Sequence, residues 1–133
     1  MENTPTILLV DDDPDDLMLL KDAIESLGEK FNFAEANNGR TALNILKKSA
    51  TEQTFPSLVV LDINMPILDG REMLAIIKSD PILKDVSVVV FSTSSNPTDI
   101  NYCKQFNVTM FSKPFNITLL KEVAKQIIQF CKY

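Results

Sequence analysis

Short aliphatic runs alternate with amphipathic segments five times along this chain of 133 residues. The segments between the runs carry apolar residues at helical spacing, as in the last one, where Leu120, Val123, Ala124 and Ile127 would share one face. A repeated strand–helix pattern predicts a parallel sheet with helices packed on both sides. We therefore expect an α/β fold with a doubly wound parallel sheet of five strands and five helices. The expected strands are residues 6–10, 31–36, 58–61, 86–91 and 108–111.

Two helix starts are strongly marked in the sequence. Asp13 precedes Pro14, Asp15 and Asp16, a pattern typical of a helix N-terminus with its capping residue, first-turn proline and first-turn acids. Asn96-Pro97 repeats the cap and proline for a helix that runs to about residue 105. We interpret Asp13, Asp15 and Asp16 as capping and first-turn acids and exclude them from any binding site.

The remaining segments give weaker signals. Residues 31–36 alternate apolar and polar side chains, so this strand is expected at a sheet edge. Residues 49–56 are polar, end in proline and are predicted to form a loop. Asp69 and Gly70 are predicted to begin a helix over residues 70–79 rather than to bind a ligand, and the last helix is expected to begin near Asn116.

Length and charge limit the classes of protein. A chain of this size forms its own core, and we expect a single domain over residues 1–133 without an output domain. The net charge of -5 and the pI near 4.6 argue against direct binding to nucleic acid or to an anionic membrane. The opening sequence MENTPT does not resemble a signal peptide, and no apolar run approaches the ~20 residues that span a bilayer. We expect a cytoplasmic protein.

Histidine is absent from the chain, and cysteine is rare. The absence of histidine excludes serine–histidine and cysteine–histidine catalysis, zinc–imidazole sites and a phosphohistidine carried by the chain itself. Cys103 and Cys131 stand 28 positions apart without a CxxC pattern, so we expect packed free thiols.

Aspartates directly follow two of the aliphatic runs. Asp62 directly follows the run LVVL, and Asp11, Asp12 and Asp13 directly follow the run ILLV. Open α/β sheets hold their ligands at the carboxyl ends of the strands, so neighbouring strands would bring three or four carboxylates together there. At about 4 Å and an effective dielectric constant near 20, each pair of charges repels by roughly 4 kcal/mol. The cluster therefore requires a cation or a protonated member, and ligands that are all oxygen favour a hard divalent ion such as Mg²⁺.

These strand ends resemble those of a known family, the receiver domains of two-component response regulators. The resemblance rests on Asp11-Asp12, on Asp62 within DINMPILDG, on Ser92 after the fourth run and on Lys113-Pro114 after the fifth. Thr93, Ser94 and Ser95 also carry hydroxyl groups, so a shift of one residue would change the assignment. Ser92 is preferred because it ends the strand directly. The resemblance covers nearly the whole chain and implies a flavodoxin-like sheet in the order 2-1-3-4-5.

The resemblance also implies a metal site and a phosphoryl acceptor. Asp62 would be the phosphoryl acceptor, and Asp12, Asp62 and the carbonyl of Asn64 would hold Mg²⁺. Asp11 would assist through water or a hydrogen bond. Ser92 would bind a phosphoryl oxygen, and Lys113 would pair with the phosphoryl group.

The implied function is that of a stand-alone response regulator rather than an enzyme. The donor would be a phosphohistidine on a histidine kinase or a histidine phosphotransfer protein, because the chain has none of its own. The chain would catalyse its own phosphorylation and dephosphorylation and signal by changed protein–protein binding to a downstream partner of unknown identity. The wide apolar stripe on the last helix would permit a homodimer.

Two features depart from the usual receiver pattern. Met110 stands three positions before Lys113, where receivers usually place an aromatic residue that couples phosphorylation to the output surface. Residues 49–56 form a longer segment than in the simplest receivers and resemble single-domain regulators of the type paired with phytochrome kinases.

Three other classes of protein share part of this pattern. A flavodoxin-type cofactor binder needs a phosphate-binding loop after the first strand, where five aspartates of this chain would repel a phosphate. A haloacid-dehalogenase-like phosphatase expects a second aspartate two residues after the first, where this chain has Asn64. A non-phosphorylated interaction module that keeps the receiver fold is the third class, and the acidic cluster argues against it.

Overall fold

The computed structural model describes residues 4–65, 68–94 and 96–132. Within these residues five strands alternate with five helices, and a short 3₁₀ helix follows the last. The elements are β1 (Thr6–Val10), α1 (Pro14–Glu25), β2 (Asn32–Ala36), α2 (Gly39–Glu52), β3 (Leu58–Leu61), α3 (Gly70–Ser79), β4 (Val88–Ser92), α4 (Pro97–Gln105), β5 (Met110–Ser112), α5 (Ile117–Ile127) and η1 (Ile128–Phe130).

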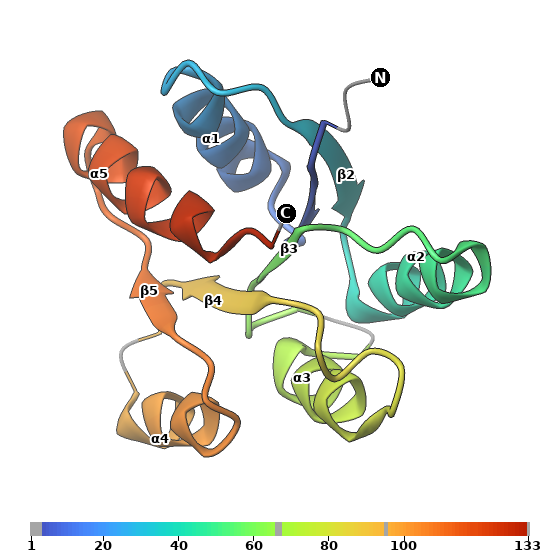
Figure 1. Ribbon diagram of the computed structural model, residues 1–133. Helices are drawn as coiled ribbons and strands as arrows, with labels where there is room; N and C mark the ends of the chain where they lie inside the picture. The colour runs from blue at the N-terminus through green and yellow to red at the C-terminus, as the bar shows by residue number, and fades with distance from the viewer. Residues whose placement is uncertain (1–3, 66–67, 95, 133) are drawn as a thin grey trace.

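All strand pairs are parallel, and the sheet has the order β2-β1-β3-β4-β5. The predicted fold class, strand order and edge position of the second strand are therefore confirmed. Helices α1 and α5 cover one face of the sheet, and α2, α3 and α4 lie on the other (Figure 1). Because the order reverses between β1 and β3, a crevice is expected at the carboxyl ends of these two strands.

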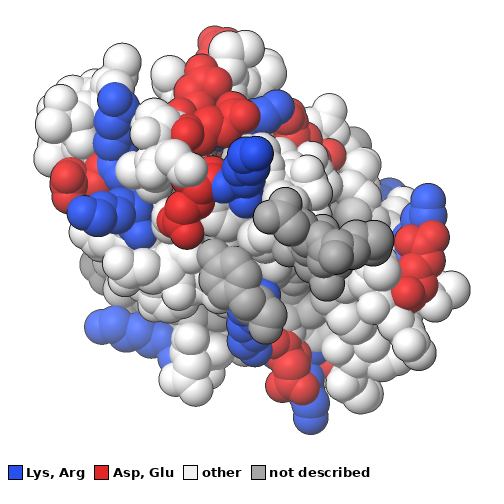
Figure 2. Space-filling model, turned by 45° about the horizontal axis from the view of Figure 1, so that its top comes forward, with Lys and Arg blue, Asp and Glu red and all other residues white. Residues whose placement is uncertain are grey.

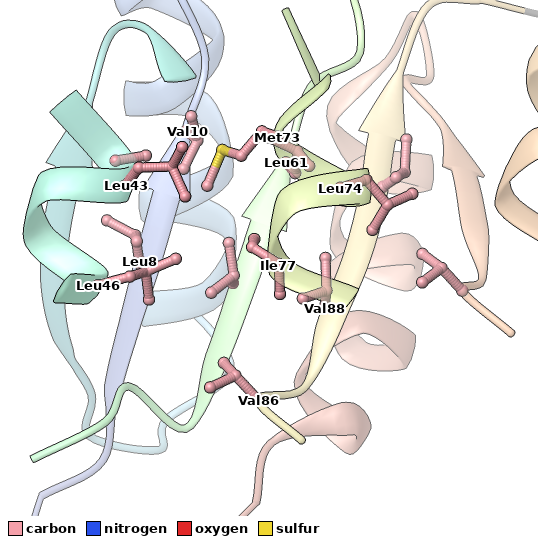
Figure 3. Close-up of a cluster of buried hydrophobic side chains, with 14 of the residues drawn as sticks. Leu8, Val10, Leu43, Leu46, Leu61, Met73, Leu74, Ile77, Val86 and Val88 are labelled. Carbon is pink, nitrogen blue, oxygen red and sulfur yellow. The ribbon is translucent and has the colours of Figure 1, made fainter. Parts of the chain in front are cut away.

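The sheet has a hydrophobic core on each face because successive side chains of a strand point to opposite sides. Leu8 and Val10 pack with α2 and α3 on one face (Figure 3). Ile7 and Leu9 pack with α1 and α5 on the other. All four residues of β3 are buried, as the unbroken aliphatic run predicted for a central parallel strand. Cys103 is buried within the first core, Cys131 is partly buried, and both are free thiols.

The predicted loop over residues 49–56 is wrong in its first half, because α2 continues to Glu52. The hydroxyl of Ser49 donates to the carbonyl of Ile45 at 3.0 Å, and that of Thr51 donates to the carbonyl of Lys47 at 3.1 Å. Polar side chains that bond back to the preceding turn can remain within a helix. Gln53 caps the carboxyl end of the helix and adopts a left-handed backbone with a φ of 56°.

Two strand boundaries also differ from the prediction. β4 begins at Val88 rather than at residue 86, because Val86 still belongs to the preceding turn, where its amide donates to the carbonyl of Leu83 at 3.0 Å. β5 covers Met110–Ser112 rather than residues 108–111, because Val108 bonds back to the end of α4 through the carbonyl of Cys103. Both shifts move the strands toward their carboxyl ends and bring Ser92 inside β4.

Acidic and basic side chains are interspersed on the face shown in Figure 2. Within the described ranges no helix combines the length and the apolar character needed to cross a membrane.

Gly70, the first residue of α3, allows the chain after β3 to fold closely against the helix. Its amide donates to the carbonyl of Ile63 at 2.9 Å. A Cβ atom at this position would lie 2.2 Å from the carbonyl oxygen of Asp62 and 2.5 Å from the Cα of Ile63. Both atoms belong to the main chain, which cannot move aside without displacing Asp62.

We expect Gly70→Ala to lower the free energy of unfolding by roughly 2 kcal/mol or more, because the added methyl group overpacks against main chain. Gly28→Ala is the matched control: an added Cβ there meets no atom within 4 Å, and only the φ of 90° is unfavourable. That variant should lose about 1 kcal/mol. Denaturant unfolding measures both, and equal losses would contradict the close-packing argument.

Candidate functional site

The carboxyl ends of β1 and β3 bring three aspartates together. Val10 is paired with Leu61 in the sheet, so the residues that follow them, Asp11 and Asp62, lie side by side. Carboxylate oxygens of Asp11, Asp12 and Asp62 all lie within 4.8 Å of one another. Asp11 and Asp62 are buried, at 6% and 7% exposure, whereas Asp12 is exposed. The convergence expected from the two strand ends is therefore present.

Main-chain amides fix the orientation of the two buried carboxylates. The amide of Asp13 donates to Oδ1 of Asp11 at 3.0 Å, and the amide of Asn64 donates to Oδ1 of Asp62 at 3.2 Å. In both residues the second oxygen, Oδ2, faces Lys113. Each carboxylate thus has one oxygen held by the chain and one directed toward the ammonium.

Lys113 enters the cluster from the loop that follows β5. Its amide donates to the carbonyl of Ser92 at 2.9 Å, which fixes the start of its side chain beside β4. The side chain is 9% exposed, and its ammonium lies 5.9 Å from the centre of the Phe91 ring. Nζ lies 2.6 Å from Oδ2 of Asp11 and 3.1 Å from Oδ2 of Asp62. A single buried cation therefore contacts both buried acids.

Asp16, which was predicted to lie outside any binding site, is the third partner of this ammonium. Its Oδ2 lies 2.8 Å from Nζ of Lys113, although the residue belongs to the first turn of α1. Asp16 stands one turn before Leu20, which is buried against the sheet, so both side chains lie on the inward side of the helix. That helical spacing was a signal in the sequence that the interpretation as a first-turn acid overlooked.

The other two acids of this segment match the interpretation given them. Asp13 is the N-cap of α1, and its Oδ1 accepts hydrogen bonds from the amides of Asp15 and Asp16 at 2.9 and 3.3 Å. Asp15 is exposed. Asp69 likewise caps α3 and forms a capping box with Glu72, as expected for a helix start.

Burial and pairing change the pKa values within the cluster. Burial raises the pKa of Asp11 to about 6, and the hydrogen bonds from Lys113 and the amide of Asp13 offset only part of this effect. Burial alone would lower the pKa of Lys113. Its hydrogen bonds to Asp11 and Asp16 and its attraction to Asp62 outweigh that effect and raise the pKa above the ordinary value.

Ser92 is fully buried at the end of β4, and its hydroxyl oxygen accepts a hydrogen bond from the amide of Ser94 at 3.2 Å. Ser94 in turn donates its hydroxyl to Oδ2 of Asp99 at 2.6 Å. Asp99 is buried in α4 and pairs with Arg71 of α3 at 2.6 Å, and the bond from Ser94, followed by Arg71, holds its pKa below the usual range. The sequence did not predict this network, because Arg71 lies 28 positions before Asp99 and only the packing of α3 against α4 brings the two together.

Met110 lies at the start of β5 and packs against the core beneath α4. Beside it a surface groove of about 540 Å³ runs between α4 and β5. Its lining includes Ile100, Lys104, Val108 and Met110.

The donor set of the acidic cluster fits a hard divalent cation. Its ligand atoms are carboxylate oxygens within 4.8 Å of one another, and Asp12 is exposed to solvent. Asn64 is exposed, and its amide is bonded to Asp62. The roles predicted for Asp11, Asp12, Asp62, Asn64, Ser92 and Lys113 stay predictions.

Comparisons with known proteins find relatives over almost the whole chain. The family model of the response regulator receiver domain matches residues 7–125. The response regulator Rcp1 of Synechocystis sp. is 32% identical over 127 residues, which cover 93% of this chain and 86% of that protein. The chemotaxis protein CheY-3 of Vibrio cholerae is 33% identical over 124 residues, which cover 92% of this chain and 91% of that protein.

Solved structures agree with this relationship. The crystal structure of the phosphorylated cyanobacterial phytochrome response regulator RcpA is 34% identical, with a TM-score of 0.87 over 97% of this chain and 94% of that one. The crystal structure of the Mn²⁺-bound form of the response regulator Rcp1 is 32% identical, with a TM-score of 0.83 over 95% of this chain and 93% of that one.

The raised pKa of Asp11 predicts how stability depends on pH. The folded state holds the proton of Asp11 up to about pH 6, whereas the unfolded chain releases it near 3.8. This contribution to stability is complete below pH 3.8 and is lost as the pH rises through 6. Between pH 4 and 7 we expect the metal-free protein to lose on the order of 2–3 kcal/mol of unfolding free energy relative to Asp11→Asn.

Denaturant unfolding in the presence of a chelator measures this difference. Asp22→Asn, an exposed acid of α1, is the control and should follow the wild-type pH dependence. A constant difference between wild type and Asp11→Asn from pH 4 to 7 would show that Asp11 titrates normally.

Proposed function

Because this chain belongs to the response regulator receiver domain family, as its strand ends predicted, we propose that Asp62 accepts a phosphoryl group in two-component signalling. The observation that carries the proposal is the buried carboxylate of Asp62, which lies 3.1 Å from a buried ammonium and beside two more acids. The ammonium of Lys113 holds Oδ2 of Asp62 in place, and a carboxylate oxygen of an aspartate can act as a nucleophile. Receiver domains generally act as signalling modules rather than as enzymes, so the chain would supply the acceptor half of the reaction.

The transfer breaks one bond at phosphorus and forms another. A carboxylate oxygen of Asp62 attacks the phosphorus of a phosphohistidine on a partner protein, and the O–P bond forms as the N–P bond breaks. The imidazole nitrogen keeps the electron pair, and the ring, protonated on its other nitrogen, leaves neutral. Hydrolysis resets the protein: water attacks phosphorus, the O–P bond breaks, and inorganic phosphate leaves Asp62 ionised.

Two side chains beside Asp62 would hold the phosphoryl oxygens. The ammonium of Lys113 already lies at Asp62 and can turn to a phosphoryl oxygen without leaving the cluster. Ser92 ends the neighbouring strand, and its hydroxyl, whose oxygen accepts from the amide of Ser94, would donate its O–H to a phosphoryl oxygen. Both donors would stabilise charge that develops on the transferring group.

The acidic cluster would hold Mg²⁺ through Asp11, Asp12, Asp62 and the carbonyl of Asn64. Bound there, the cation would neutralise charge on the phosphoryl oxygens. The oxygen-only donor set supports this assignment, and so does the Mn²⁺-bound form of the related Rcp1.

The phosphoryl donor would be a histidine kinase or a histidine phosphotransfer protein, because this chain contains no histidine. We further propose that the chain acts as a stand-alone regulator, which its likeness to nearly the full length of Rcp1 and RcpA supports. Output would pass to a downstream protein or a second copy of the chain across the groove between α4 and β5, beside Met110.

Incubation with Mg²⁺ and a small phosphodonor should add the mass of one phosphoryl group to the protein. Asp62→Asn should abolish the addition, because an amide neither attacks phosphorus nor balances the metal charge. Asp85→Asn, an exposed acid outside the cluster, should retain it. Intact-protein mass spectrometry measures the outcome. An unmodified wild type under several donors would favour a non-phosphorylated interaction module with the same fold.

Mg²⁺ should stabilise the protein, because relief of repulsion among the clustered acids is available only in the folded state. At a concentration 100 times its dissociation constant, a bound ion raises the unfolding free energy by about 2.7 kcal/mol. Asp12→Asn should lose most of this gain, and Asp22→Asn should keep it. Thermal unfolding across a Mg²⁺ titration tests this, and equal gains in wild type and Asp12→Asn would place the metal elsewhere.

A further inference from the structure

The three partners of the Lys113 ammonium differ in what the proposed reaction does to them. An ammonium has three donors, and Lys113 directs them at Asp11, Asp16 and Asp62 at 2.6, 2.8 and 3.1 Å. Asp11 and Asp62 also belong to the acidic cluster that fits a cation. Asp16 lies outside that cluster, so its carboxylate is the partner that keeps its full charge for Lys113.

Loading the site would weaken two of the three contacts. A cation held by Asp11 and Asp62 would share their negative charge and repel the nearby ammonium. Phosphorylation would then convert the attacking Asp62 oxygen into the bridging oxygen of an acyl phosphate. Lys113 would be drawn to the phosphoryl group, but before transfer only Asp16 would still hold its ammonium beside Asp62.

We propose that Asp16 is a positioning residue that keeps the Lys113 ammonium beside Asp62 when the cation is bound, so that it meets the incoming phosphoryl group. The proposal rests on the function proposed above. Asp16 is suited to this role because it projects from the first turn of α1, which Asp13 caps independently. Its side chain is 32% exposed, so it can follow a small shift of the ammonium.

A simpler account treats Asp16 as one of two acids that stabilise the positive end of α1. Asp15 separates the two accounts, because it occupies the same helical turn and carries the same charge but is exposed. A role at the helix terminus predicts similar effects of Asp15→Asn and Asp16→Asn. A role through Lys113 predicts an effect of Asp16→Asn alone.

The first experiment observes the ammonium itself. Nitrogen-15 NMR of the Mg²⁺-loaded protein should show a slowly exchanging Lys113 ammonium signal, identified by its loss in Lys113→Met. We expect the signal to persist in Asp15→Asn and Asp16→Glu and to disappear through fast exchange in Asp16→Asn. Amide spectra verify that each variant is folded, and Asp16→Ser repeats the test should Asp16→Asn fail to fold.

The second experiment measures phosphorylation by a small phosphodonor at saturating Mg²⁺. Asp16→Asn should lower the maximal rate constant about tenfold, the effect of losing one charge-assisted hydrogen bond, with little change in the donor concentration for half-maximal rate. Asp16→Glu should restore most of the rate, and Asp15→Asn should match the wild type.

Persistence of the ammonium signal in Asp16→Asn, or its absence in the wild type, would overturn the proposal. Equal rate losses in Asp15→Asn and Asp16→Asn would overturn it as well. A wild type that no donor phosphorylates would refute the proposed function instead, and the ammonium signal would still decide whether Asp16 holds Lys113.

Discussion

The contact between the Lys113 ammonium and the buried carboxylates is the interaction on which the site depends. Two acids at 6% and 7% exposure lie beside each other, and an unpaired charge in such a place is strongly unfavourable. One buried cation satisfies both and leaves the cluster with an excess of negative charge. Burial raises the pKa of Asp11, with a smaller contribution from the charge of Asp62, and the excess of negative charge suits the cluster to a divalent ion. The same charge balance therefore accounts for both the stability and the proposed chemistry of the site.

The fold creates this arrangement through strand order rather than through proximity in sequence. Asp11 and Asp62 meet because β1 and β3 are neighbours, although 51 positions separate the two residues in the sequence. Lys113 reaches them because its amide bonds to Ser92 at the end of β4. Gly70 lets the start of α3 lie against the main chain of Asp62 and Ile63. Each of these constraints acts on the main chain, so the positions of the side chains follow from the sheet.

The sequence was sufficient to locate the strands and the residues that follow them, because aliphatic runs mark buried parallel strands directly, and the resemblance to receiver domains supplied the strand order. It failed where side chains rather than main chain decide the outcome. The serine and threonine hydroxyls at the end of α2 bond back into the helix, which composition alone presents as a loop. Asp16 is a first-turn acid whose spacing from Leu20 places it on the inward side of α1, but its contact with Lys113 depends on where the fold brings that side chain. The pair of Arg71 and Asp99 joins two helices whose packing no local pattern encodes.

The most direct test of the central claim locates the phosphoryl group after loading. Borohydride reduces an aspartyl phosphate to homoserine, so peptide mass spectrometry of the reduced protein identifies the acceptor residue. Homoserine at position 62, dependent on both Mg²⁺ and the phosphodonor, is the predicted result. Homoserine at another aspartate, or an unmodified peptide around Asp62 in a protein that has gained phosphate, would contradict the account.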